Sequence, residues 1–86
     1  MTYKEAFELA KEIDKNLLAT DKRFRRSVQI IDEEGTTLFY HNAFIEEKDE
    51  YIFLFTEHHK FEVFHKEDLL YYSKFQRVGV SKLKEY

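Results

Sequence analysis

Histidines and carboxylates are the residues of this chain whose types could bind a metal ion. His58 and His59 are adjacent and follow Glu57, while His41 and His65 lie in segments expected to form neighbouring strands. Imidazole nitrogens and carboxylate oxygens form the tetrahedral shell that Zn²⁺ prefers. Adjacent residues of a strand point to opposite faces, however, and neither a His-x-x-x-His nor a His-Glu-x-x-His spacing occurs. The sequence therefore predicts no metal site, and a small-ligand or metal-binding domain near His41 and His58 is only a third hypothesis.

Catalytic motifs are missing from the sequence. The chain has no Cys, which excludes disulfides, a thiolate nucleophile and Cys-ligated zinc. Neither a Ser in a nucleophile-elbow context nor a Gly-rich phosphate loop occurs. Acidic residues are plentiful, but they fall mainly in predicted loops and on the outer face of a predicted helix, where they line no cleft. We therefore predict no catalytic residue, no cofactor and no enzymatic activity.

Basic residues gather early and late in the chain, although its formal net charge is −3. Residues 22–26 include Arg23, Arg25 and Arg26, and the segment 71–86 is basic as well. If these segments lie side by side, they form a positive patch that neutralises phosphates, with Tyr72 placed to stack on a base. The alternative function is therefore a nucleic-acid-binding small barrel that uses these four residues. A basic strand edge that prevents sheet-to-sheet aggregation is the structural explanation of the same pattern.

Acidic residues are concentrated in the middle of the chain. The segments 32–34 and 46–50 are rich in Asp and Glu and are predicted to form two loops at one end of a sheet. Clustered carboxylates dock on basic protein surfaces and steer association, although acidic loops also serve solubility alone. Glu46, Glu47 and Glu50 are the residues that we expect to orient a protein partner. Small inhibitors of host machinery encoded by phages or mobile elements are a concrete version of this hypothesis.

An amphipathic helix is predicted from about residue 3 to about residue 18. Thr2 followed by Glu5 matches a capping box, in which each side chain satisfies the backbone N–H of the other residue. Apolar residues then recur at helical spacing, and mixed charges fill the remaining surface. The helix is therefore expected to bury one face and to expose the other.

The rest of the chain has the pattern of antiparallel strands. Strands are expected at 24–31, 36–45, 51–56 and 61–64, and Gly35 is the expected positive-φ residue of the first turn. Residues 65–68 are interpreted as a turn into a fifth strand over 69–72, with a short helix through residue 75 as the alternative, and a further strand at Val78 and Val80 is also considered. The predicted class is α+β, a helix followed by a four- to five-stranded meander. A small SH3-like or Sm-like barrel has the same element order.

The predicted sheet is apolar on both faces, although one helix covers only one face of an open sheet. In the segment 51–56 Tyr51 and Phe53 point one way while Ile52 and Leu54 point the other. We consider three explanations for the second face. The sheet curls into a barrel that encloses it, another molecule covers it, or it lines a pocket for a small apolar ligand. For a protein interface, the apolar contacts are assigned to Tyr40, Phe44, Tyr51 and Phe53.

A single domain over residues 1–86 follows from the length of the chain. The absence of Cys favours a reducing compartment, so a cytoplasmic location is expected. No apolar run is long enough to span a membrane. The leading prediction is a small non-enzymatic protein-binding or regulatory module that binds a protein partner or associates with itself.

Overall fold

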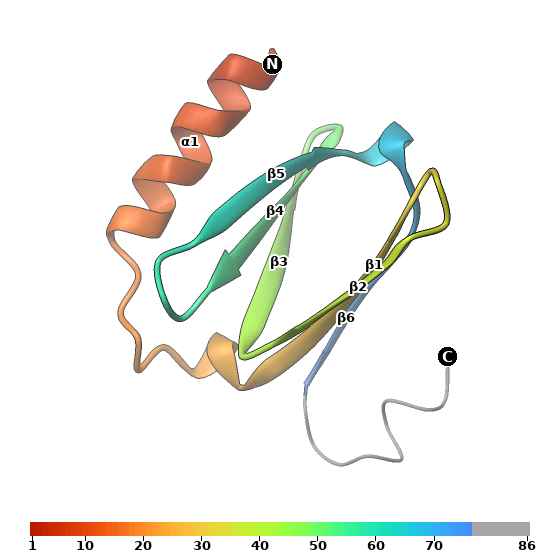
Figure 1. Ribbon diagram of the computed structural model, residues 1–86. Helices are drawn as coiled ribbons and strands as arrows, with labels where there is room; N and C mark the ends of the chain where they lie inside the picture. The colour runs from red at the N-terminus through yellow and green to blue at the C-terminus, as the bar shows by residue number, and fades with distance from the viewer. Residues whose placement is uncertain (77–86) are drawn as a thin grey trace.

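The computed structural model describes residues 1–76 and has the predicted α+β class. One N-terminal helix is followed by six antiparallel strands in two three-stranded sheets, with the orders β2-β1-β6 and β3-β4-β5. The helix lies on one face of the β3-β4-β5 sheet and the other sheet covers the opposite face (Figure 1). The elements are α1 (Tyr3–Lys15), η1 (Lys22–Arg25), β1 (Arg26–Asp32), β2 (Thr37–His41), β3 (Ala43–Lys48), β4 (Tyr51–Thr56), β5 (Phe61–His65), η2 (Lys66–Asp68) and β6 (Leu69–Gln76). No helix in this part of the chain is long and apolar enough to cross a membrane.

The capping box at the start of α1 is confirmed. The Thr2 amide donates to Glu5 Oε1 at 2.8 Å, and the Glu5 amide donates to Thr2 Oγ1 at 3.2 Å. The helix buries Ala6 and Ala10 and ends at Lys15, about three residues before the predicted end. Leu17 is still buried, but it packs against the core from the loop that follows the helix. Leu17 therefore fits the helical spacing of apolar residues because it is buried, although it lies outside the helix.

The first strand begins two residues later than predicted. Phe24 and Arg25 belong to the 3₁₀ helix η1, and β1 starts at Arg26. The turn that follows β1 is as expected, because Gly35 has a φ of 85° and its amide donates to the Asp32 carbonyl. The Asp32 side chain accepts hydrogen bonds from the amides of Glu34 and Thr36, which fixes this turn from within.

The segment predicted as one strand over 36–45 is broken at Asn42. This residue has a φ of 55°, a left-handed conformation that Asn tolerates better than most residues. The break separates β2, which pairs with β1, from β3, which pairs with β4. The prediction of a charged loop over 46–50 is also wrong in part, because β3 continues through Lys48 and only Asp49 and Glu50 form the turn.

The second apolar face is covered by the chain itself. Val28 and Ile30 of the outer sheet pack against Ile52 and Leu54 of the middle sheet, while Phe53 and Phe55 face α1. Residues 1–76 thus form three layers, and closure of the two sheets into a barrel is not found in this part of the chain. The predicted strand over 69–72 is confirmed and continues to Gln76, since β6 follows η2 and pairs with β1, so the alternative of a short helix through residue 75 is wrong. The positions of Val78 and Val80 lie outside the described residues.

Candidate functional site

Most of the aromatic residues predicted for protein contact lie in the core. Phe44, Tyr51 and Phe53 are at most 5% exposed and belong to the cluster between α1 and the middle sheet. Phe44 packs on Phe24 and Phe55 with ring centroids 5.2 and 5.3 Å apart. Their rings therefore offer no surface to a partner in this structure. Tyr40 differs, because it is half-buried at the border between the two sheets.

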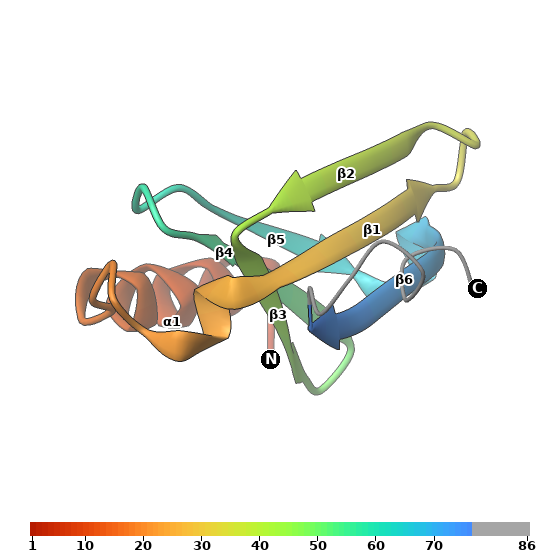
Figure 2. The same cartoon turned by 90° about the horizontal axis from the view of Figure 1, so that it is seen from below.

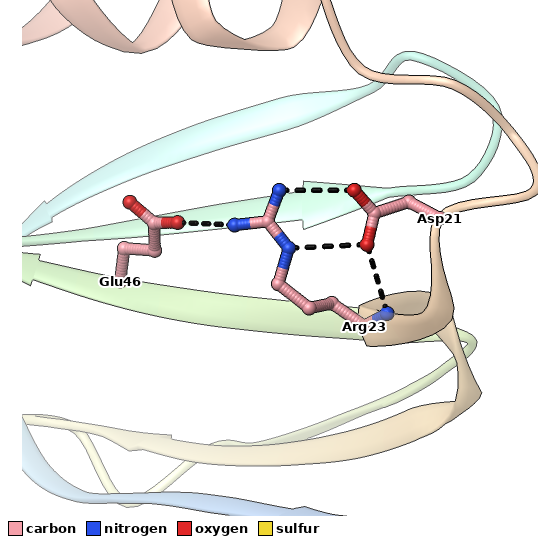
Figure 3. A network of polar contacts seen from close by, with 3 residues as sticks. All are labelled: Asp21, Arg23 and Glu46. Carbon is pink, nitrogen blue, oxygen red and sulfur yellow. Dashed lines mark hydrogen bonds and ion pairs between the residues drawn. The ribbon is translucent and has the colours of Figure 1, made fainter.

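Arg23 is held inside a polar network that joins η1 to β3 (Figure 3). Its guanidinium donates to Asp21 Oδ1 and Oδ2 at 3.1 and 3.0 Å, and to Glu46 Oε1 at 2.7 Å. The guanidinium carbon also lies 4.4 Å from the centroid of the Phe44 ring, within the range of a cation–π interaction. The sequence predicts that Arg23 contacts nucleic acid and that Glu46 orients a protein partner. In the structure the two side chains are instead bound to each other.

The same network shifts two pKa values. Hydrogen bonds from the Arg23 side chain and backbone lower the pKa of Asp21 to about 2, because they stabilise the ionised carboxylate. The pKa of Arg23 is raised, with the hydrogen bond to Asp21 as the main cause. Both groups are thus charged across the physiological pH range, and the network fixes the entry of the chain into β1.

The rest of the predicted nucleic-acid site is only partly assembled. The β1–β6 pairing sets Arg26 opposite Gln76, so the early basic segment does lie beside the C-terminal strand. Arg25 is exposed and Arg26 is half-buried. Tyr72, predicted to stack on a base, is half-buried and packs against the cluster between the sheets. Arg25 is therefore the exposed member of this site, whereas Arg23, Arg26 and Tyr72 are each half-buried.

The predicted acidic loops meet at one end of the molecule. The amide of Lys66, the first residue of η2, donates to the Glu50 carbonyl at 2.8 Å, and the Glu33 amide donates to the Asp68 carbonyl at 3.1 Å. Because η2 bonds to both turns, the β1–β2 and β3–β4 turns are joined through it. Figure 1 shows these turns and the short segment between β5 and β6 at the same end.

Exposed carboxylates gather at this end of the molecule. Lys66 Nζ lies 3.3 Å from Glu47 Oε2. We use the name acidic end for the exposed residues Glu33, Glu34, Glu47, Asp49, Glu50, Glu67 and Asp68. Sequence reasoning placed Glu47 and Glu50 here, but it missed Glu67 and Asp68, because the η2 segment was interpreted as a connecting turn or the start of a short helix and not as part of the acidic surface. The Lys-Glu-Asp sequence itself gave no indication that its backbone would bond to the other two turns.

A cleft of about 470 Å³ lies between β2 and the β4–β5 hairpin. Leu54 and Phe61 supply apolar wall, and Tyr40 donates from its hydroxyl to Glu62 Oε2 at 2.8 Å. Burial, followed by this bond to a carboxylate, raises the pKa of Tyr40 to about 12. His41 and His58 both line the cleft, which places the third hypothesis there.

The histidines do not assemble a metal shell within residues 1–76. His58 Nε2 lies 3.5 Å from Glu57 Oε1, whereas His59 turns away and its Nδ1 lies 3.1 Å from the Asp14 carbonyl oxygen. No group of three or more potential metal ligands is found in this part of the chain. The adjacent histidines thus contact different neighbours, and they lie in the turn between β4 and β5, where strand alternation does not apply.

Comparison with protein-family models, with curated proteins and with solved structures finds no match to this chain. The function is therefore inferred from the geometry of the described residues alone.

Proposed function

We propose that this chain is a non-enzymatic protein-binding or regulatory module that docks its acidic end on a basic surface of a partner protein. The observation that carries the proposal is the pair of backbone hydrogen bonds from η2, which join the two acidic turns. They add the carboxylates of Glu67 and Asp68 to those of the turns. Like charges held together repel one another, and a cationic partner relieves that repulsion on binding.

The acidic end is also held in place by hydrogen bonds and an ion pair, which carboxylates that serve only solubility do not need. Asp32 fixes the β1–β2 turn through two backbone amides, and Lys66 lies within ion-pair distance of Glu47. A preformed arrangement of charges loses less conformational entropy on docking than a flexible loop does. A small inhibitor of host machinery, encoded by a phage or mobile element and acting in the cytoplasm, is the concrete form of this function that we favour.

The other predicted contact surfaces support the proposal less. The rings of Phe44, Tyr51 and Phe53 are buried, and Arg23 is bound to Asp21 and Glu46. Exposed charge on the acidic end is accordingly the feature that a partner reaches without rearrangement of the core. Electrostatic contacts of this kind act mainly on the rate of association, and they weaken as salt rises.

The test is capture of a partner from native cell lysate, with and without nuclease, read by mass spectrometry. The double substitution Glu34→Lys/Glu50→Lys reverses charge on both turns. We expect it to abolish capture of a nuclease-resistant partner at physiological salt and to slow association by about tenfold or more. Glu8→Lys/Glu12→Lys changes the net charge equally on the exposed face of α1, so it is the matched control and should capture normally.

Two results would contradict this function. Full capture by the Glu34→Lys/Glu50→Lys protein, with thermal unfolding unchanged, would exclude docking through the acidic end. Capture that disappears after nuclease treatment would instead favour the nucleic-acid alternative, with Arg25 and Arg26 of the β1 entry as the residues to substitute next.

A further inference from the structure

Among the described residues, no strand pairs with the outer edge of β2, and β2 has no Asp, Glu, Lys or Arg to protect that edge. Within residues 1–76 β2 pairs only with β1, and Figure 2 shows β1 between β2 and β6. Its sequence, Thr-Leu-Phe-Tyr-His, contains no Asp, Glu, Lys, Arg or Pro. Both border strands of the middle sheet carry charged residues, such as Lys48 in β3 and Glu62 in β5. Proteins use such charges to prevent edge-to-edge pairing, so β2 is, unlike the border strands of the middle sheet, an edge left open to another strand.

The pattern of exposure along β2 is symmetric about Phe39. Thr37, Phe39 and His41 are exposed, while Leu38 and Tyr40 are half-buried on the face toward the middle sheet. The Phe39 ring is 42% exposed and lies 4.9 Å from the His41 ring, which gives the strand an aromatic outer surface. When two copies of this strand run antiparallel with Phe39 opposite Phe39, exposed residues meet exposed residues and half-buried residues meet half-buried ones.

The cleft lies directly beside this free edge. Tyr40 and His41 of β2 form one wall of the cleft, and Phe61 and Glu62 of β5 lie on the other side. A strand added beyond β2 would extend the outer sheet over this opening. In the antiparallel register its Leu38 and Tyr40 would face the same way as their counterparts in the first copy, toward the apolar lining.

We propose that the chain associates with a second copy of itself through antiparallel β2–β2 pairing about a twofold axis at Phe39. The pairing places Thr37 of one copy opposite His41 of the other, and it joins the two outer sheets into one continuous sheet. A twofold interface is closed, because each copy uses its single free β2 edge, so association stops at the dimer. The surface is separate from the acidic end, and the failure of either proposal leaves the other intact.

The dimer is expected to be weak and dependent on concentration. Only five residues pair on each side, with the Phe39 rings and the side chains over the cleft as the main apolar contacts. Interfaces that bury less than about 1,200 Å² in total are generally transient. Sedimentation velocity from low micromolar to near-millimolar protein should therefore show a monomer that shifts to a dimer, with no larger species.

A Phe39→Lys substitution tests the centre of the interface. It sets two ammonium groups opposite each other at the twofold axis, and we expect the dissociation constant of the dimer to rise by about tenfold or more. The matched control is Leu70→Lys, which adds the same charge at another exposed apolar position, on the opposite border strand β6. Thermal unfolding of both variants at low concentration checks that each monomer is folded, and Phe39→Thr replaces Phe39→Lys if it is not.

The register is tested by two charge patterns at the outer positions of β2. Thr37→Glu/His41→Lys sets opposite charges across both ends of the proposed pairing, so dimerisation should be retained or strengthened. Thr37→Lys/His41→Lys sets like charges at the same positions, so the dimer should be lost. Monomer at every wild-type concentration would overturn the proposal. Dimer formation that is unaffected by Phe39→Lys, or that responds only to Leu70→Lys, would overturn it as well.

Discussion

The two sheets of this protein differ in how their faces are used. Every residue of β4 from Tyr51 to Phe55 is buried, because α1 covers one face of the middle sheet and the outer sheet covers the other. β2 of the outer sheet instead alternates between exposed and half-buried residues. A run of apolar residues on both faces of a strand thus marks the middle layer, and alternation marks a sheet with one face in solvent.

This difference separates structural aromatic residues from those at the surface. Phe53 and Phe39 are both strand phenylalanines, yet Phe53 is 1% exposed and Phe39 is 42% exposed. The free β2 edge belongs to the outer sheet, whereas the acidic end combines the β1–β2 turn with Glu47 of β3, the β3–β4 turn and η2. The buried interior of the middle sheet is therefore the scaffold, and the proposed binding surfaces lie at the turns and on the border strand β2.

The largest expected contrast is between Phe53→Ala and Phe39→Ala. Removal of the Phe53 ring leaves a cavity beneath α1, so the free energy of unfolding should fall by about 3–5 kcal/mol. Loss of the partly solvated Phe39 ring should cost less than about 1 kcal/mol for the monomer. Urea unfolding of the two variants at low protein concentration measures both values. Equal losses would show that the outer sheet is as tightly packed as the middle one.

A smaller effect is expected from Asp21→Asn, which weakens the network between the β1 entry and β3. Hydrogen bonds from Arg23 lower the pKa of Asp21 from 3.8 to about 2 in the folded chain. The carboxylate therefore stabilises the fold above pH 3.8, and this contribution is lost as the pH falls toward 2. The substitution should cost about 1–2 kcal/mol at neutral pH.

The pH dependence provides the check on this interpretation. The stability difference between wild type and Asp21→Asn should shrink as the pH is lowered through the range between the two pKa values, as measured by urea unfolding in a series of acidic buffers. A difference that stays constant over that range would mean that the charge of Asp21 contributes nothing and that only its size or shape matters.

The smallest effect compares two hydroxyls, the buried one of Ser27 in the outer sheet and the partly exposed one of Thr56 in the middle sheet. Ser27 of the outer sheet is 0% exposed, and its Oγ has no hydrogen-bond partner among the described residues. Thr56 of the middle sheet instead accepts from the Lys60 amide and donates to the Lys60 carbonyl. Ser27→Ala should leave stability unchanged or raise it by up to about 1 kcal/mol, because a desolvated, unpaired hydroxyl is removed.

Thr56→Ala is the matched substitution, and it should lower stability by about 1 kcal/mol because the Lys60 amide loses its acceptor, although the Lys60 carbonyl still accepts from the Thr56 amide. Thermal unfolding of both variants under the same conditions ranks them. A loss on Ser27→Ala equal to that on Thr56→Ala would show that the Ser27 hydroxyl is bonded in solution.

Local chemistry allowed much of the secondary structure to be predicted. The Thr2–Glu5 capping box, the Gly35 turn and the strand 51–56 depend on neighbouring residues, and each is found as expected. The break at Asn42 was missed, although a left-handed Asn between two apolar segments is a signal that sequence alone carries. Glu46 and Glu47 were placed in a loop because charge was taken to indicate a turn.

The sequence by itself determined the α+β class, the position of the helix and the presence of two apolar faces that had to be covered. Only the tertiary structure decided what covers the second face, because the partner of a strand face depends on contacts between residues far apart in the chain. It likewise decided that Arg23 binds Glu46 and that η2 joins the acidic turns, since both contacts link segments well separated in the sequence. The local sequence pattern determines the individual helices and strands, whereas binding surfaces form only when helices and strands far apart in the chain pack together.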